Sequence, residues 1–480
     1  MSPTHTWMKD FRTFRFGNKM NENNFMNPDP HLIQKYNVSG PRYTSYPTAV
    51  QFEEVREASV GGEMIREHRG SENLSLYFHI PFCFSLCWFC GCTKIITKDA
   101  DRGDVYLDYL EKEIDLIRPH LLNAASNVIQ IHFGGGTPTF LSPGQLKRLG
   151  VLIQTHFDID EDVEYSVEID PRRCSEDQIR MLREIGCNRA SLGIQDIHPE
   201  VQKAIHRVQP FEQVVQVTEW LRSTGFEGVN FDLIYGLPKQ TPATFRQTIH
   251  EVTQLNPDRL AVYSYAHIPD LMPAQKLLNE DEFPSTEEKL EMLTYSIEAL
   301  PSYGYRFIGM DHFAKEEDEL TRALDNGTLQ RNFQGYSTRP GADMIAFGMS
   351  GISQVGDVYF QNSKDLSDYY RYLDQNLLPV VKMLKLNRDD RIRRDLIMKI
   401  MCQTDLNFQD FSEKWGIDFE TYFRQENHQL IQLEEDGLVY RSGQGLQTTE
   451  KGRLFLRNIA MVFDAYFQSP GQKKRYSKTV

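Results

Sequence analysis

Short apolar runs alternate with amphipathic helical patterns between residues 76 and 300 of the chain. Each run is about the length of one strand, and the apolar residues between the runs recur with the period of a helix. Strands that alternate with helices pair side by side as a parallel sheet, because each helix carries the chain back to the start of the next strand. The pattern predicts six strand–helix units, with strands at residues 76–80, 128–133, 165–169, 190–194, 229–234 and 260–265.

Capping residues mark the ends of several of these helices. Ser175 and Gln178 have the spacing of a capping box, and Gly186 is placed to stop the helix that follows them. Thr241 before Pro242 predicts the start of another helix, because proline is favoured in the first helical turn. Periodic apolar residues at 107–117 and 290–300 predict two more.

Polar residues stand at or near the carboxyl end of nearly every predicted strand. Side chains at the carboxyl ends of parallel strands face one rim, so these residues predict a ligand site at a single mouth. Six units, where a closed barrel has eight, predict an incomplete barrel with an opening wide enough for a large substrate. The two histidines in the set suit either a structural hydrogen bond or catalysis. The residues are His79, Gly134, Gly135, Gly136, Thr137, Glu168, Asp170, Gln195, Asp196, Asp232 and His267.

The pattern changes near residue 389. A helical stretch at 390–401 precedes further helices and a hairpin at 438–448, which is typical of a winged-helix module. The first 30 residues are polar and rich in Asn, and they suit a flexible extension better than a transit peptide. We expect an N-terminal extension and substrate-covering segment (1–70), a partial barrel (71–310), a barrel-completing and connecting region (311–388) and a mainly helical C-terminal domain (389–480).

Composition narrows the range of functions. A net charge of -14 over 480 residues argues against binding of nucleic acid or anionic lipid through a broad positively charged surface. No apolar run approaches the roughly 18 residues that a membrane-spanning helix needs, so we expect no membrane insertion. Seven cysteines, four of them within ten residues, do not resemble a disulfide framework and predict a cytoplasmic protein.

Cys83, Cys87 and Cys90 carry the strongest chemical signal. Their spacing allows three thiolates to bind one cubane iron–sulfur cluster, which normally takes four, so one iron stays open to another ligand. An open coordination position is typical of a catalytic centre. With Cys92 the four thiols could instead hold zinc, although structural zinc sites usually draw ligand pairs from two separate segments.

A triple glycine and several polar residues complete the candidate site. Gly134, Gly135 and Gly136 let the backbone approach a ligand closely, although a triple glycine by itself often marks only a tight turn. The remaining polar residues could each be a rim ion pair or a helix cap. Because they recur on successive units around one mouth, contact with a ligand explains them better. They are Gln195, Arg207 and Asp232.

The cysteine spacing is that of radical S-adenosylmethionine (SAM) enzymes, in which the open iron chelates the amino and carboxylate groups of SAM. Over nearly the whole chain beyond the N-terminal extension, the sequence resembles the family of oxygen-independent coproporphyrinogen III oxidases. Long, dispersed segments carry the resemblance, and the presence of Cys92 and of segment 40–48 separates it from haem-handling relatives. The segments are 40–48 (GPRYTSYPT), 77–92, 134–139 (GGGTPT), 168–172 (EIDPR), 192–196, 232–240, 309–314, 331–338 and 457–464.

Carried over by matching position, the resemblance implies a 4Fe-4S cluster on three cysteines and two bound SAM molecules. The cluster ligands would be Cys83, Cys87 and Cys90. The first SAM would contact Tyr77, Gly135, Glu168 and Ile352. The second SAM would contact Phe89, Gly136, Thr137, Gln195, Arg207, Asp232 and Ala266.

The implied reaction is oxidative decarboxylation of the ring A and B propionates of coproporphyrinogen III to vinyl groups, giving protoporphyrinogen IX, by a 5'-deoxyadenosyl radical from SAM. The implied partners are a tetrapyrrole substrate and a reduced flavodoxin or ferredoxin-like electron donor, with no nucleic acid, and we expect a monomer. Within the same class the alternative is a haem-handling or porphyrin-modifying relative without this activity. A zinc-stabilised winged-helix regulator is the alternative from another class, and the acidic charge speaks against it.

Overall fold

The computed structural model of the chain describes residues 30–55, 60–68, 71–121, 127–467 and 476–479. One 13-stranded sheet runs in the order β1-β17-β16-β15-β14-β2-β5-β6-β7-β8-β9-β11-β10. Its six central strands are parallel, and each contains or overlaps one of the predicted runs. They are β2 (Asn73–Ile80), β5 (Asn127–Gly135), β6 (Asp158–Ile169), β7 (Arg189–Gln195), β8 (Gly228–Tyr235) and β9 (Arg259–Ser264).

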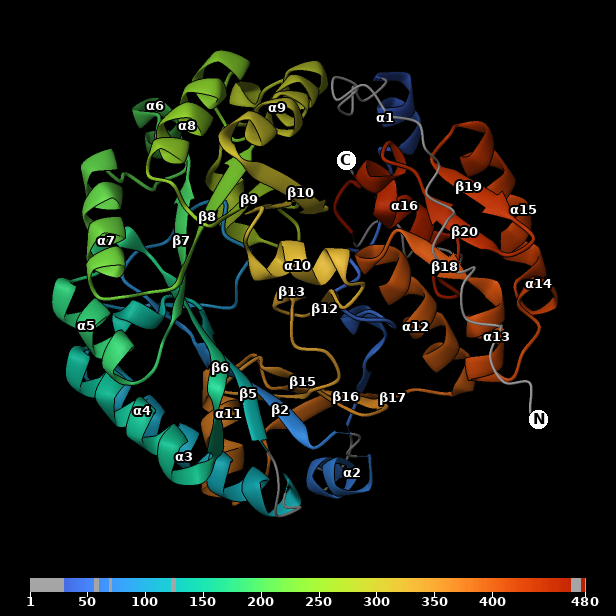
Figure 1. Ribbon diagram of the computed structural model, residues 1–480. Coiled ribbons are helices and arrows are strands. Elements are labelled where there is room, and N and C mark those ends of the chain that lie inside the picture. The colour runs from blue at the N-terminus through green and yellow to red at the C-terminus, as the bar shows by residue number, and fades with distance from the viewer. Residues whose placement is uncertain (1–29, 56–59, 69–70, 122–126, 468–475, 480) are drawn as a thin grey trace, which may run out of the picture.

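Helices cover the outer face of this curved sheet (Figure 1). The apolar sides of the helices and of the strands meet in one core, which includes Phe78, Phe133, Leu192 and Phe231. The fold class predicted from the sequence, an incomplete six-unit α/β barrel, is confirmed. The helices are α3 (Arg102–Leu121), α4 (Pro143–His156), α5 (Glu176–Glu184), α6 (Pro199–Ala204), α7 (Phe211–Ser223), α8 (Pro242–Gln254) and α9 (Thr286–Ala299).

The predicted helix boundaries are present. Ser175 accepts a hydrogen bond from the Gln178 amide and the Gln178 side chain caps Ser175 in return, which completes the capping box at the start of α5. Thr241 caps α8, with Pro242 in its first turn. These caps satisfy amide groups that a helix start otherwise leaves without partners.

Two additions widen the barrel beyond the six predicted units. Strand β14 pairs parallel with β2, and three further antiparallel strands and β1 extend that edge, whereas β11 and β10 extend the other edge beside β9. The hairpin of β12 (Gln330–Asn332) and β13 (Gly335–Ser337) lies between the two edges (Figure 1). The added strands are β14 (Asp343–Phe347), β15 (Ile352–Val355), β16 (Val358–Asn362), β17 (Val380–Lys385), β1 (Glu53–Glu54), β10 (Tyr305–Gly309) and β11 (His312–Lys315).

Four other helices lie among these elements: α1 (Pro30–Tyr36), α2 (Val60–His68), α10 (Glu319–Asp325) and α11 (Leu366–Asp374). Helix α10 lies at the centre of the view in Figure 1, between the barrel and the C-terminal domain. None of the helices in the described ranges is both long and apolar enough to cross a bilayer.

The C-terminal domain is mainly helical and has its own core, which includes Phe411, Phe419 and Phe423. Three short antiparallel strands form a small sheet in the order β18-β20-β19, and the predicted hairpin at 438–448 is the β19–β20 pair. The elements are α12 (Arg388–Cys402), β18 (Asp405–Asn407), α13 (Phe408–Trp415), α14 (Phe419–Tyr422), α15 (Arg424–Glu435), β19 (Val439–Ser442), β20 (Gly445–Thr448) and α16 (Leu456–Met461).

The segment that follows α1 packs between this domain and the barrel edge. Tyr43 and Tyr46 are fully buried, and the Tyr43 hydroxyl donates to Asp464 over 2.9 Å. Arg42 pairs with Asp311 at the barrel edge over 2.6 Å. The segment thus ties the C-terminal domain to the turn between β10 and β11.

Candidate active site

The three cysteines of the predicted cluster lie on the loop that follows β2. Strand β3 (Phe82–Cys83) pairs with β4 (Ile95–Ile96) and fixes the two ends of this loop. In its middle, Trp88 stacks on His206, and the His206 ring contacts the Leu86 carbonyl oxygen over 2.8 Å. The thiols of Cys83, Cys87 and Cys90 line one cavity of about 310 Å³ at the carboxyl ends of the strands, which we call the rim cavity.

Hydrogen-bond donors surround the sulfur atoms. Arg172 and Arg207 approach Cys87 Sγ at 3.3 and 3.5 Å, and the Thr137 hydroxyl lies 3.3 Å from Cys83 Sγ. Positive charge favours thiolates, and hydrogen bonds to the sulfurs set the reduction potential of an iron–sulfur cluster. The donor set therefore fits a cluster held by these cysteines.

Among the described residues, no three His, Cys, Asp or Glu side chains are arranged to hold a single metal ion.

Burial raises the pKa of Cys83 to about 11, whereas a hydrogen bond from Cys92 lowers the pKa of Cys90 to about 6. Cys92 therefore stabilises the charged form of its neighbour within the rim cavity.

The glycine run at the end of β5 faces the cysteine loop. Gly135 has a φ of 110°, and a Cβ there would lie 2.6 Å from the His79 ring. A Cβ on Gly136 would lie 2.5 Å from the Pro81 carbonyl oxygen, which belongs to the backbone just before the first cysteine. Only glycine at these two positions lets the end of β5 approach His79 and Pro81 this closely. The distance between β5 and the start of the cysteine loop therefore depends on both residues.

Glu168 on β6 is held in its charged form. Burial favours the neutral carboxyl, but hydrogen bonding and charge from His132 and the Gly135 amide keep its pKa below the ordinary value. The Gly135 amide donates to Glu168 Oε2 over 3.0 Å, and His132 Nε2 lies 3.5 Å from Oε1. The carboxylate lines the rim cavity, where it can accept from an ammonium or hydroxyl group.

Asp170 lies beside the cysteine loop, just after β6, and binds two arginines. Arg172 reaches its Oδ2 atom at 2.6 Å and Arg207 reaches the same oxygen at 3.2 Å. Burial opposes ionisation, yet the two guanidinium groups hold the pKa of Asp170 below its usual range. Since both arginines also contact Cys87, Asp170 positions them against the sulfur.

Asp232 and Gln195 also line the rim cavity. Burial, with the charge of Glu168, raises the pKa of Asp232 to about 6, although Ser191 and Asn230 donate to it over 2.8 and 2.9 Å. Gln195 has a φ of 67°, and the pairing of β7 with β8 shifts register next to it. Such an irregularity redirects a side chain at a strand end.

Eleven of the fourteen predicted site residues line the rim cavity. Ala266, Tyr77 and Ile352 are not among the lining residues. Ala266 is linked to the cysteine loop, because Gln275 donates to the carbonyls of both Ala266 and Phe89 over 3.1 Å. Tyr77 stacks on His132, and Ile352 packs against a separate apolar cluster on β15–β17.

The two histidines that the sequence left open both have structural partners. His79 contacts the Thr93 carbonyl and the Tyr77 hydroxyl, each over 3.0 Å, and thereby holds the end of the cysteine loop. His267 contacts Glu280 over 3.0 Å. Ser191 and Tyr263 were not singled out from the sequence, although both line the rim cavity; their positions within predicted strands were the only available signal.

A second cavity of about 160 Å³, the interior cavity, lies deeper in the barrel. It shares Glu168, Ser191, Asp232 and Tyr263 with the rim cavity, so the two hollows meet at these residues. Its far end lies at the first residues of β7, β8 and β9, where Arg189 and Arg259 stand.

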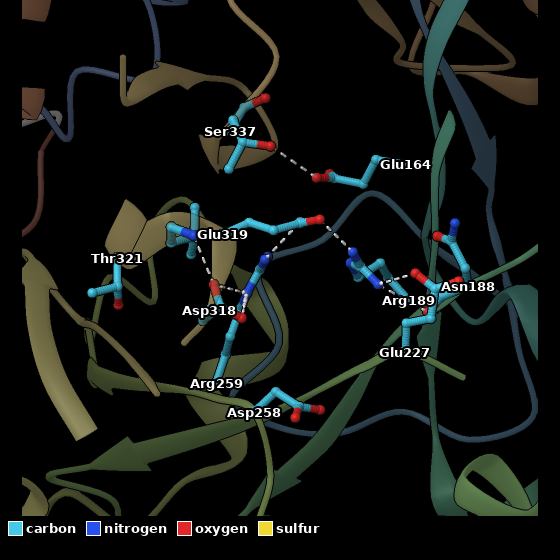
Figure 2. Close-up of polar contacts among 12 residues, drawn as sticks. Glu164, Asn188, Arg189, Glu227, Asp258, Arg259, Asp318, Glu319, Thr321 and Ser337 are labelled. Carbon is cyan, nitrogen blue, oxygen red and sulfur yellow. Dashed lines mark hydrogen bonds and ion pairs between the residues drawn. The ribbon is translucent and has the colours of Figure 1, made fainter. Parts of the chain in front are cut away.

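Helix α10 closes this far end through ion pairs, which form the barrel floor (Figure 2). Arg189 pairs with Glu319 over 2.7 Å and with Glu227 over 3.2 Å. Arg259 pairs with Asp318 over 2.9 Å, and Asp318 also caps the start of α10. The charges of the floor therefore neutralise one another.

Comparison with known proteins defines the class. The chain matches the Radical SAM superfamily over residues 77–252 and the HemN C-terminal domain over residues 386–455. A parallel partial barrel with three thiols at its rim agrees with the first match. The chain is therefore a radical SAM enzyme, and this class works with a 4Fe-4S cluster and SAM.

Relatives of nearly the same length define the family. The oxygen-independent coproporphyrinogen III oxidase of Pseudomonas aeruginosa is 46% identical over 94% of this chain and 98% of its own length. That of Escherichia coli is 44% identical, again over 94% and 98%. The solved structure of coproporphyrinogen III oxidase (HemN) from Escherichia coli matches with a TM-score of 0.87 and 43% identity over 92% of this chain and 99% of that one. The chain belongs to the family of oxygen-independent coproporphyrinogen III oxidases, as the sequence motifs predicted.

Proposed function

We propose that this enzyme converts coproporphyrinogen III to protoporphyrinogen IX without oxygen, by oxidative decarboxylation of the ring A and B propionates to vinyl groups. Each conversion removes a hydrogen atom from the propionate β-carbon, then carbon dioxide and one electron. The observation that carries the proposal is the rim cavity itself, which joins four thiols, a glycine run and three carboxylates in a chain 46% identical to a coproporphyrinogen III oxidase.

We assign the cluster to Cys83, Cys87 and Cys90. The cluster and SAM, when bound, supply a 5'-deoxyadenosyl radical that abstracts hydrogen. The chain's own contribution is positional: Arg172 and Arg207 stabilise negative charge on Cys87, and Gly136 keeps the loop against β5. Cys92 raises the thiolate fraction of Cys90.

We further assign the lining residues outside the cysteine loop to two SAM molecules. Glu168 is ionised and faces the rim cavity, which suits the ammonium or ribose hydroxyl groups of SAM. Asp232 and Gln195 line the same cavity and would supply further acceptors for a second molecule.

We propose a reduced flavodoxin or ferredoxin-like protein as the electron donor. A hollow of about 430 Å³ lies on the outer side of the cysteine loop and shares Ser85, Thr137, Asp170 and Arg172 with the rim cavity. Arg173 adds positive charge to it, which suits an acidic carrier. We place the enzyme in the cytoplasm as a monomer, since its seven cysteines are free and the cluster thiols must stay reduced.

Anaerobic reconstitution with iron and sulfide, followed by assay with coproporphyrinogen III, SAM and a reductant, tests the function. We expect carbon dioxide and protoporphyrinogen IX to form while SAM is consumed. Cleavage of SAM without carbon dioxide would instead indicate a haem-handling or porphyrin-modifying enzyme. A protein that binds no iron under these conditions would contradict the cluster assignment.

A further inference from the structure

Three arginines, of which Arg331 and Arg457 are buried and Arg42 is one third exposed, gather where the barrel edge, the β12–β13 hairpin and the C-terminal domain meet. They come from three distant segments of the chain: Arg42 follows α1, Arg331 lies on β12 and Arg457 lies on α16. All three act electrostatically on Asp311, and Arg42 and Arg331 also act on Arg457. We call this group the arginine cluster.

The arginine cluster is short of negative charge. Arg42 pairs with Asp311 over 2.6 Å, whereas among the described residues neither Arg331 nor Arg457 has a carboxylate at ion-pair distance. Arg457 donates only to neutral groups, including the carbonyls of Pro41 at 2.9 Å and Lys478 at 2.7 Å. Burial, and then the charge of Arg42, lower the pKa of Arg457 to about 9. Uncompensated buried charge is costly, so an anion would stabilise this place.

Arg331 has an unused hydrogen-bond donor. Its side chain is 8% exposed, and its Nη1 atom is buried with no hydrogen-bond partner in the described part of the chain. Its Nε atom makes a long contact of 3.4 Å to the Arg42 carbonyl. Buried guanidinium groups are nearly always paired, so an orphaned nitrogen on a cation points to a missing acceptor.

The paired arginines of the barrel floor show the contrast. Arg189 and Arg259 also border the interior cavity, but Glu319, Glu227 and Asp318 neutralise them. Only the Nε of Arg189 lacks a partner there, and both its Nη atoms are engaged. The arginine cluster therefore has more positive charge than its carboxylates neutralise, whereas the arginines of the barrel floor do not.

Two residues of the arginine cluster lie against tyrosines that line the cavities of the barrel. Tyr263 lines both the rim cavity and the interior cavity, and Arg42 lies 5.7 Å from the centre of its ring. Arg331 lies 4.8 Å from the ring centre of Tyr336, which lines the interior cavity with His312. Nδ1 of His312 is buried and also lacks a partner. A carboxylate arm extending from the rim past Tyr263 would thus meet unused donors.

We propose that Arg331, supported by the positive charge of Arg42 and Arg457, binds a propionate carboxylate of the tetrapyrrole substrate and thereby anchors the macrocycle beside the rim cavity. This inference rests on the proposed function, since it takes a polycarboxylate substrate as given. A fork-shaped guanidinium pairs with both oxygens of a carboxylate, which fixes the orientation of the ligand as well as its affinity. Arg207, which lines the rim cavity, is already engaged by Asp170, Cys87 and the Gly193 carbonyl.

The test is equilibrium binding of coproporphyrin III, the stable oxidised form, to the reconstituted enzyme, measured by its fluorescence. The tetramethyl ester of the same porphyrin serves as the uncharged probe. We expect Arg331→Gln to weaken binding of the free acid about 10- to 100-fold, the value of a lost charged hydrogen-bond pair, and to leave binding of the ester unchanged. Arg331→Lys should fall between, because it restores charge without the fork.

Arg306→Gln is the matched control, since Arg306 is a β10 residue that pairs with Asp325. This variant should bind both probes as the wild type does. If Arg331→Gln does not fold, Arg42→Gln, at a side chain 33% exposed, decides the question by the same two probes. Equal loss for acid and ester would show a packing role and overturn the inference, as would unchanged affinity for the free acid. If the wild type neither binds coproporphyrin III nor releases carbon dioxide from coproporphyrinogen III, the proposed function itself fails.

Discussion

The rim and the floor of the same barrel use charged residues in opposite ways. At the rim, Glu168, Asp170 and Asp232 face a cavity that also contains free thiols and glycine amides. At the floor, Arg189 and Arg259 form ion pairs with carboxylates of the protein itself (Figure 2). Rim charges are arranged for something that binds, whereas floor charges are arranged for the protein itself.

The pKa shifts follow this division. Burial raises the pKa of Asp232 to about 6, whereas neighbouring positive charge keeps the pKa of Asp170 low despite burial. Different environments give carboxylates on one rim different charge states, which is typical of a functional site. A charged residue on a barrel can therefore be assigned a role only when its position and its interaction partners are known.

The largest expected effect is that of Cys87→Ser at the rim. A serine hydroxyl does not replace a thiolate on iron, so the reconstituted protein should lack the visible absorbance of the cluster and should neither cleave SAM nor release carbon dioxide. Iron content and absorbance of anaerobic protein measure this directly. The control is Cys174→Ser, a partly buried cysteine outside the rim cavity, which should keep iron and activity. A fully active Cys87→Ser enzyme would overturn the cluster assignment.

Next in size is Glu168→Gln, which removes the charge that faces the rim cavity. The Gly135 amide keeps an acceptor, but the charged acceptor for a SAM ammonium or hydroxyl is lost, so SAM should bind about 10- to 100-fold more weakly. Equilibrium dialysis of SAM against the reconstituted protein measures the change, while the iron content should stay at the wild-type level. Unchanged SAM affinity would remove Glu168 from the binding assignment.

Residues that line the rim cavity could be predicted from the sequence, whereas the ion pairs of the barrel floor could not. Six apolar runs, the cysteine spacing, the glycine run and the polar residues near the strand ends predicted the barrel and ten of the cavity-lining residues, because strand periodicity and turn chemistry are local. Only the family resemblance implied Phe89. The pairing of Arg189 with Glu319 joins residues 130 positions apart, and no local pattern marks it. Likewise, short antiparallel strands such as β15 and β16 depend on their neighbours in the sheet more than on their own sequence.

A smaller effect concerns pH and Asp232. The pKa of Asp232 is about 6 in the folded protein, above the ordinary 3.8. The free energy of unfolding therefore falls as pH rises between these two values, because the buried carboxyl becomes charged, and the decrease is complete above about pH 6. Binding has the opposite sign, since an ionised acceptor exists only above pH 6. We expect SAM affinity at pH 5 to be about tenfold lower than at pH 7, if the carboxylate is required.

Asp232→Asn separates these two effects. The variant should bind SAM weakly with no step near pH 6, yet at pH 7 its free energy of unfolding should exceed that of the wild type by about 1–3 kcal/mol. Denaturant titrations and SAM binding at pH 5, 6 and 7 measure both quantities. An unchanged step near pH 6 in the variant would assign the titration to another group.

The smallest expected effect lies at the floor, in Glu319→Gln. The substitution has the same chemistry as Glu168→Gln, but Glu319 is one third exposed and its role is to pair with Arg189 over 2.7 Å and with Arg259 over 3.5 Å. Partly exposed pairs of this kind contribute about 1 kcal/mol, so the free energy of unfolding should fall by that amount while SAM affinity and turnover stay within about twofold. Urea titration and steady-state assays of the two Glu→Gln variants side by side measure the contrast. If Glu319→Gln reduced SAM affinity as much as Glu168→Gln did, rim and floor would be coupled, and the division between a binding end and a structural end of the barrel would be wrong.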